Sequence, residues 1–155
     1  MTIRSGVLIE RATWRDLSTL LSLEKDCFGR DAWPWIDCLA ALTFPEIVRL
    51  KAVCEDRTIG FVIGDRRRRE SLGWIASIGI HPDFRRQGIG RRLLLACEEQ
   101  LAMPRLRLTL RDSNRNAKSL YQNCGYVEVD VWSQYYADGE NGIVMEKTIR
   151  TLENT

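Results

Sequence analysis

The sequence lacks the features of a membrane-spanning or secreted protein. No apolar run in its 155 residues approaches the roughly 20 residues that a helix needs to cross a bilayer. The segment 1–10 contains no hydrophobic stretch of the kind found in secretion signals, so we expect a cytoplasmic protein with no membrane partner. Because hydrophobic residues make up 45% of the chain and charged residues 28%, the composition is that of a globular protein with a sizeable core.

The spacing of the cysteines excludes two further classes of protein. They are odd in number and scattered, no Cys-x-x-Cys pair occurs, and the chain has a single histidine. This pattern argues against both a disulfide framework and a zinc site, so we expect no bound metal. We interpret the cysteines as small buried apolar residues in a reducing compartment. The five are Cys27, Cys38, Cys54, Cys97 and Cys124.

Neither sign of charge dominates the chain. With 23 basic and 21 acidic residues the net charge is +2, which gives no broad electrostatic footprint for nucleic acid, and we expect no such partner. The one basic run is Arg66–Arg69, which lies between two strand-like segments. A solvated hairpin loop is one interpretation of this run, and a patch that attracts an acidic partner is the other.

No internal repeat, low-complexity tract or Pro/Gly/Ser-rich linker divides the chain, so we expect one domain over residues 1–155. Thr13 and Asp16 resemble a capping box at the start of the first helix, and Asp56-Arg57 resembles a hairpin turn. The expected helices cover 14–27, a short segment from 33, 88–101 and 114–123, and the expected strands cover 7–10, 48–55, 58–65, 74–80, 106–110, 126–132 and 142–147. This order predicts an α/β fold, a mixed sheet with helices on both faces.

The main chemical signal is a glycine-containing loop between a strand and a helix. Pro82 ends the strand, and Gly88 and Gly90 stand where the helix begins. Glycine lets the backbone approach a bulky anion, and the N–H groups and dipole of a helix N-terminus favour phosphate. Three arginines add positive charge: Arg85, Arg86 and Arg91. Spacing alone leaves a phosphate site and a structural helix cap as alternatives, because the third glycine of a dinucleotide fingerprint and the Gly-Lys-Ser/Thr of a P-loop are absent.

Three segments in order resemble one enzyme family. Arg85-x-x-Gly88-x-Gly90, after an Ile-Gly-Ile strand and a proline, resembles the acetyl-CoA motif of the GCN5-related N-acetyltransferase (GNAT) superfamily. The segment Leu110–Tyr126 is similar to the family's second signature, in which an Asn opens a helix and Tyr-x-x-x-Gly-Phe/Tyr closes it. The segment Tyr135–Glu140, followed by Val144-Met145, resembles the C-terminal hairpin of the N-terminal (Nα) acetyltransferases, the branch that includes RimI-type and Ard1-related enzymes.

The resemblance covers about Ile9 to Met145 and implies a single GNAT domain, with a mostly antiparallel mixed sheet whose central parallel strand pair splays apart. Acetyl-CoA is the implied cosubstrate. Its pantetheine arm would bond the backbone of Ile78–Ile80, and its pyrophosphate would lie on the N–H groups of Arg86–Arg91. The implied cofactor-binding residues are Ile78, Gly79, Ile80, Arg85, Arg86, Gln87, Gly88, Ile89, Gly90, Arg91, Asn114 and Tyr121.

The resemblance also implies a catalytic acid but leaves the base open. Tyr121 falls on the family's usual general acid, whose hydroxyl would protonate the leaving thiolate; packing against the core is the alternative role. RimI-type enzymes carry a glutamate four residues before the Ser of the Arg-x-Ser-Asn motif, and this chain has Thr109 there. Asp31, in the loop where Ard1-like enzymes place a carboxylate, is one candidate base. His81 and a water chain with no dedicated base are the others.

Aromatic residues are the candidates for acceptor binding. Tyr135 and Tyr136 precede the turn signal Asp138-Gly139, and strand alternation would place them on opposite faces. The resemblance implies that they contact the first residues of a substrate peptide, and a cross-strand pair that stabilises the sheet is the alternative. Trp33 and Trp35 are candidates for the opposite wall of the cleft or for core anchors.

We therefore expect acetyl transfer to the α-amine of a protein or peptide N-terminus. An α-amine has a pKa of about 7.7–8.0, so it fits the missing glutamate better than a lysine with a pKa of about 10.4. One alternative is acetylation of a small amine, such as a polyamine, amino acid or aminoglycoside. The other is a non-catalytic acyl-CoA-binding regulatory protein. The sequence does not distinguish a monomer from a homodimer.

Overall fold

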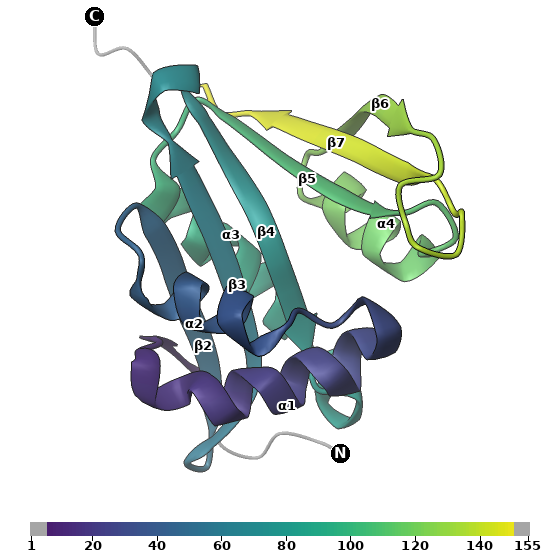
Figure 1. Cartoon of the computed structure of the whole chain (residues 1–155). Helices are drawn as coiled ribbons and strands as arrows, with labels where there is room; N and C mark the ends of the chain where they lie inside the picture. Colours follow the sequence, from purple (N-terminus) through teal and green to yellow (C-terminus); the bar gives the residue numbers. More distant parts are fainter. Residues whose placement is uncertain (1–5, 151–155) are drawn as a thin grey trace, which may run out of the picture.

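The computed structural model describes residues 6–150 and contains one seven-stranded sheet in the order β1-β2-β3-β4-β5-β7-β6 (Figure 1). The strands are β1 (Leu8–Arg11), β2 (Ile47–Cys54), β3 (Arg57–Arg67), β4 (Leu72–Ile80), β5 (Arg105–Arg111), β6 (Val127–Trp132) and β7 (Gly142–Thr148). The helices are α1 (Leu17–Phe28), α2 (Trp35–Thr43), α3 (Ile89–Leu101) and α4 (Arg115–Asn123). Within residues 6–150, none of the helices has the length and apolarity that crossing a bilayer requires.

The central strands β4 and β5 form the one parallel pair of this sheet, and they separate after four paired residues. Leu72–Ile75 lie opposite Arg105–Leu108, and no pairing between the two strands follows. Ala76 is an extra residue on β4, because Ile75 lies opposite Gly64 and Ser77 opposite Ile63 on β3. A bulge of this kind bends and twists its strand. The two strands diverge beyond it (Figure 1), which confirms the expected splayed pair in a mostly antiparallel sheet.

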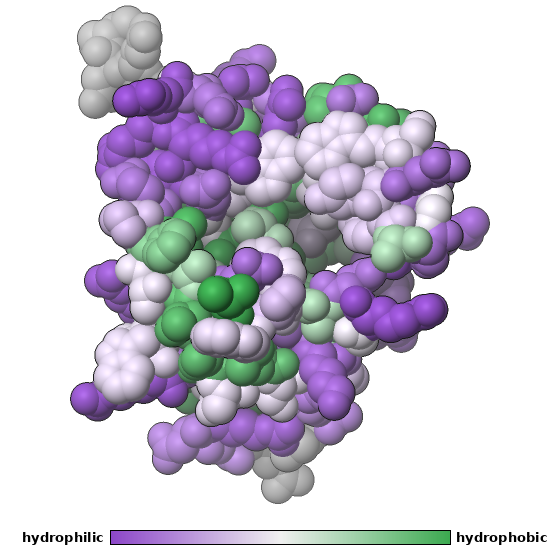
Figure 2. All heavy atoms as spheres, in the orientation of Figure 1, coloured by the Kyte–Doolittle hydropathy of each residue, from purple (hydrophilic) through white to green (hydrophobic). Residues whose placement is uncertain are grey.

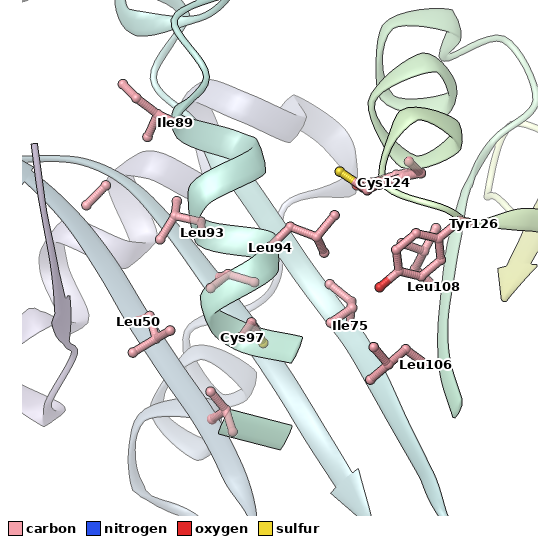
Figure 3. Close-up of a cluster of buried hydrophobic side chains, with 14 of the residues drawn as sticks. Leu50, Ile75, Ile89, Leu93, Leu94, Cys97, Leu106, Leu108, Cys124 and Tyr126 are labelled. Atoms are coloured by element: carbon pink, nitrogen blue, oxygen red, sulfur yellow. The ribbon is translucent and has the colours of Figure 1, made fainter. Parts of the chain in front are cut away.

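Helices cover both faces of the sheet, as expected. Leu93, Leu94 and Cys97 of α3 are fully buried on one face (Figure 3). On the other face α1 and α2 pack against Phe61 and Ile63, which point away from α3 because side chains alternate along a strand. The two cores therefore share one sheet, and α1 and α2 leave the β5–β7 side of their face uncovered (Figure 1).

A buried ionic group connects the two halves of the divided sheet. Glu98 of α3 is 4% exposed and accepts hydrogen bonds from the Tyr126 hydroxyl at 2.9 Å and from Lys147 Nζ of β7 at 2.7 Å. Because α3 packs on β2–β4 and Lys147 belongs to the β5–β7 half, these bonds fix the halves relative to each other. Burying a carboxylate is costly, and the hydrogen bond from Tyr126 and the ion pair with Lys147 offset that cost.

Local details both confirm and correct the sequence-based expectations. The Thr13 N–H donates to Asp16 Oδ2 at 2.8 Å, as in the predicted capping box. The hairpin turn lies one residue earlier than expected, at Glu55 and Asp56 (φ 49° and 61°), because Arg57 already pairs with Cys54.

The basic run Arg66–Arg69 is not simply a solvated loop. Arg66 belongs to β3, and its guanidinium donates to the carbonyls of Gln100 and Leu101 at the end of α3. It satisfies carbonyls that a helix C-terminus leaves without partners and interacts favourably with the helix dipole. The next arginines form exposed ion pairs, such as Arg68 with Glu46 at 2.6 Å.

The close approach of α3 to β3 yields a test of the packing. A Cβ at Gly64 would lie 2.7 Å from Cys97 Sγ and 2.9 Å from Leu101 Cδ1, and both side chains are fully buried. We expect Gly64→Ala to lower the free energy of unfolding by about 1–3 kcal/mol. Gly6→Ala, where a Cβ meets no atom within 4 Å, is the control and should change it little. Urea unfolding measures both, and equal stabilities would contradict this account.

Candidate active site

Two adjoining cavities open where β4 and β5 diverge. The larger, of about 490 Å³, lies along β4 and the loop before α3. The smaller, of about 270 Å³, is walled by the α1–α2 loop and the β6–β7 loop. Four residues line both cavities: Tyr121 of α4, Asn114 just before α4, Ile78 of β4 and Phe28 of α1. Figure 2 shows a recess in this face between the β6–β7 lobe and the helices α1 and α2.

The larger cavity ends at a concave, basic loop. Arg86 and Gly88 have φ of 63° and 78°, left-handed conformations of the kind found in anion-binding backbone concavities, and α3 begins at Ile89. N–H groups in the first turn of a helix have no carbonyl within the helix to bond. A Cβ at Gly88 would meet no atom within 4 Å, and Arg91 also lines the cavity. This loop combines space, donors and positive charge for an anion.

Beyond the bulge, the β5-facing edge of β4 has no strand beside it. Ile78 and Gly79 pair only with Val62 and Phe61 of β3. Their other edge can therefore bond an extended ligand as another strand would. The Ile80 carbonyl already accepts from Arg85 Nε at 3.0 Å and Cys27 Sγ at 3.4 Å, so Arg85 also holds the loop in place.

The other residues that we expect to bind the cofactor differ in which of their groups face the cavity. The Ile89 side chain is 2% exposed and belongs to the core, which leaves its backbone to the cavity. Asn114 caps α4, and its Oδ1 accepts from the Ala117 N–H at 3.2 Å. Gln87 belongs to the same loop but is not among the residues that line either cavity.

Tyr121 lies at the junction of the two cavities. Its side chain is buried, and its ring packs edge-on against Tyr126 with 6.0 Å between ring centroids. Burial raises the pKa of the Tyr121 hydroxyl above its usual value, with smaller contributions from Tyr136 and Cys124. The hydroxyl therefore stays protonated at neutral pH and can act as a proton donor to either cavity.

Tyr135 and Tyr136 do not lie on opposite faces of a strand, because β6 ends at Trp132 and both residues belong to the loop that follows. Their rings contact each other edge-on at 5.0 Å, and both line the smaller cavity. The aromatic contacts continue outward through Trp132 to Trp74 of β4, whose rings stack with centroids 5.8 Å apart. This stack holds the β6–β7 loop across the sheet.

The tryptophans before α2 have different positions. Trp33 lines the smaller cavity and packs against the core beneath α1, which combines the two expected roles. Trp35 is 59% exposed and lines neither cavity, so it is neither a wall residue nor a core anchor.

His81, a candidate base in the sequence, also lies outside both cavities. Its Nδ1 accepts from the Asp83 N–H at 3.2 Å, which stabilises the turn after β4.

Arg111 joins the two loops that wall the smaller cavity. Its Nε and Nη2 donate to the two carboxylate oxygens of Asp31 at 2.6 and 2.8 Å, and its Nη1 donates to Asp138 and Glu140 at 2.9 and 3.2 Å. The guanidinium also lies 4.2 Å from the centroid of the Tyr136 ring. Both oxygens of Asp31 are thus engaged, which makes it a wall residue rather than a free base.

The rim of this cavity is negatively charged. The pKa of Glu140 is lowered first by the hydrogen bond from Ser113 and then by Arg111, and the pKa of Asp138 is lowered by backbone hydrogen bonding and Arg111. Three carboxylates, those of Asp31, Asp138 and Glu140, surround the one guanidinium of Arg111, which is a formal local charge of −2. Such a rim attracts a cation.

Glu24 is a cavity residue that the sequence analysis missed. It is 1% exposed on α1 and lines the smaller cavity beside Ser77. The sequence indicates its burial, because Glu24 follows Leu20 by four residues and therefore lies on the apolar face of the helix. Thr109 lines the same cavity, and its Oγ1 is buried and has no hydrogen-bond partner among residues 6–150.

Nothing in the described part of the chain resembles a metal centre. No group of three or more His, Cys, Asp or Glu side chains within residues 6–150 could hold an ion. The five cysteines are free thiols, and all except the half-buried Cys27 are buried.

Comparison with known proteins identifies this arrangement. Residues 49–128 match the family model described as an acetyltransferase (GNAT) domain. The chain is 28% identical to the N-terminal acetyltransferase A complex catalytic subunit NAA10 of Arabidopsis thaliana, over 96% of this chain and 81% of that protein. It is 30% identical to the [ribosomal protein bS18]-alanine N-acetyltransferase of Haemophilus ducreyi, over 89% and 97%. The corresponding Escherichia coli enzyme structure shares the fold, with a TM-score of 0.86 at 24% identity over 97% and 99% of the two chains.

The bonds of Arg111 predict how the cavity walls move. Arg111→Gln removes the ion pairs that link the two loops, so we expect amide hydrogen exchange in residues 29–34 and 133–141 to become at least tenfold faster. Arg107→Gln is the matched control, because Arg107 lies on the same strand and pairs only with Glu146 at 3.3 Å. Equal exchange in both variants would mean that other contacts hold the loops.

Proposed function

The chain belongs to the acetyltransferase (GNAT) domain family and is an acetyl-CoA-dependent N-acetyltransferase, and we propose that its acceptor is the α-amine of a protein or peptide N-terminus. The observation that carries this proposal is the smaller cavity, an anionic, aromatic-walled pocket that meets the larger cavity at Tyr121. The names of the two relatives, which describe enzymes that act on protein N-termini, support the same acceptor class.

We propose that acetyl-CoA binds in the larger cavity and supplies the acetyl group as a thioester. The loop before α3 suits a pyrophosphate, because Gly88 leaves space, the first-turn N–H groups are donors, and Arg86 and Arg91 are cationic. The open edge of β4 at Ile78 and Gly79 suits the amide groups of a pantetheine arm. An arm bonded there would bring its thioester towards the junction of the cavities.

The smaller cavity suits a chain end that carries positive charge. Its volume of about 270 Å³ leaves room for a terminal residue rather than for a folded segment. The charge of −2 around Arg111 attracts the ammonium form of an amine. The rings of Trp33, Tyr135 and Tyr136 provide apolar walls for a first side chain. An acceptor held there would lie beside the thioester, and holding the two reactants in a fixed geometry accelerates their reaction.

We assign the proton-donor role to Tyr121. When the acceptor nitrogen bonds to the acetyl carbon, the carbon–sulfur bond breaks and its electron pair remains on sulfur. Tyr121 lies where the two cavities meet, and burial keeps its hydroxyl protonated until a stronger base forms beside it. The hydroxyl then donates its proton to sulfur.

Tyr121→Phe tests this role. Loss of the donor should lower kcat by about 10²-fold and change KM for either substrate much less, because general acid catalysis typically contributes 10²–10⁴-fold. Tyr126→Phe is the control: its ring contacts Tyr121, but its hydroxyl bonds Glu98 away from the junction. Initial rates of thiol release measure both, and a wild-type rate for Tyr121→Phe would remove it from the mechanism.

A panel of acceptors tests the proposed function itself. Peptides with a free α-amine should be acetylated, and the same peptides with a blocked N-terminus and a lysine inside should not. Because the rim is anionic, KM should be lower for a peptide with a basic second residue than for one with an acidic residue. Turnover of small amines alone would replace the peptide proposal. Binding of coenzyme A without any transfer would identify a non-catalytic protein.

A further inference from the structure

The proposed reaction needs a proton acceptor, since an amine enters an anionic cavity as an ammonium ion and must lose a proton before it can attack. Of the residues that line the smaller cavity, two are carboxylic acids, Glu24 and Asp31. Both carboxylate oxygens of Asp31 accept hydrogen bonds from the guanidinium of Arg111, at 2.6 and 2.8 Å. Glu24 is therefore the carboxylate available to the interior of the cavity.

Glu24 is connected to the cavity through a hydroxyl. Ser77 Oγ donates to Glu24 Oε1 at 2.7 Å, and the Trp33 N–H donates to Oε2 at 3.1 Å. Ser77 lies on β4 directly before Ile78, where the open edge of the strand begins. The lone pairs of Ser77 Oγ remain available to accept from an N–H in the cavity.

The surroundings of Glu24 raise its affinity for a proton. No lysine or arginine among residues 6–150 forms an ion pair with it, although it is 1% exposed. Burial raises the pKa of Glu24, and the hydrogen bonds from Ser77 and Trp33 oppose this only in part. A carboxylate of raised pKa is better matched to an amine than an ordinary surface carboxylate is.

We propose that Glu24, acting through Ser77, accepts the proton that the acceptor ammonium loses. The ammonium nitrogen passes one proton to Ser77 Oγ while the proton already on Oγ moves to Glu24 Oε1. The nitrogen keeps the electron pair and becomes a neutral amine, Ser77 remains a hydroxyl, and Glu24 becomes a neutral acid. The proton on Glu24 returns to solvent after the product leaves.

Thr109 positions the amine for this transfer. Its buried Oγ1 lacks a partner among the described residues, and Thr109 of β5 lines the same cavity as Glu24 of α1. A buried hydroxyl without a partner is costly, and an ammonium N–H in the cavity would satisfy it. Ser77 and Thr109 would thus hold the same nitrogen from two sides, which aligns one N–H with the path to Glu24.

This inference rests on the proposed function and is tested with whichever acceptor the wild-type protein acetylates. Glu24→Gln keeps the size of the side chain and its ability to accept from Trp33, but it cannot take up a proton. We expect kcat to fall by about 10²-fold with little change in KM. Ser77→Ala should cause a comparable loss, and the double variant should lose little more than either single variant, because both changes break one path.

Rescue separates a chemical role from a structural one. Thr109→Glu places a carboxylate in the same cavity, so Glu24→Gln/Thr109→Glu should regain at least tenfold in kcat over Glu24→Gln. If Glu24 only held the α1–α2 loop through its bond to Trp33, a glutamate at position 109 would not restore that bond, and kcat would not recover. Asp26→Asn is the matched control, an exposed carboxylate on the same helix that should not affect the rate. Thermal unfolding and coenzyme A binding establish that each variant is folded.

Three results would overturn the assignment of Glu24. The first is a kcat within threefold of wild type in Glu24→Gln. The second is a folded but inactive Glu24→Gln that Thr109→Glu does not rescue. The third is a wild-type rate in Ser77→Ala, which would exclude the path through that hydroxyl. If the wild-type protein acetylates no amine, the proposed function fails, and this is seen before any variant is made.

Discussion

The site depends on one constraint, the short parallel pairing between β4 and β5. Four residues of each strand pair, and the bulge at Ala76 then turns β4 away from its neighbour. Backbone groups that a continuous sheet would satisfy are thereby left for a ligand along Ile78 and Gly79. The same divergence creates the space in which Tyr121 meets both cavities. The interruption of the sheet is thus the origin of both cavities.

The two halves of the divided sheet are connected on each side by a group of hydrogen-bonded ion pairs. Glu98 connects α3 to Tyr126 and Lys147 behind the sheet. Arg111 connects the loops across the opening in front. The group around Glu98 is shielded from water and fixes the two halves of the fold relative to each other. The group around Arg111 lies at the rim of the smaller cavity, where its excess of carboxylates makes the local charge negative.

Much of the fold and part of the site follow from local patterns. The helix 89–101 and the strands around it appear as clear periodicities, and the Gly88-x-Gly90 loop marks an anion site because its chemistry resides in consecutive backbone groups. Strand alternation predicts opposite faces for Tyr135 and Tyr136, but both lie in the loop after β6, where that alternation does not apply. The sequence offers a solvated loop or a patch for an acidic partner as interpretations of Arg66–Arg69, and it does not show the actual partners of Arg66, because these carbonyls at the end of α3 are 34 and 35 residues away.

The sequence by itself determined the fold class, the family resemblance and the loop that suits a phosphate, because each depends on residues close together in the chain. Only the tertiary structure decided which carboxylate is paired with a cation and which is not. Asp31 is engaged by Arg111, 80 residues away, and Glu24 meets Ser77 at a separation of 53. Which carboxylate is paired depends on contacts across such separations, and spacing along a sequence carries no record of them.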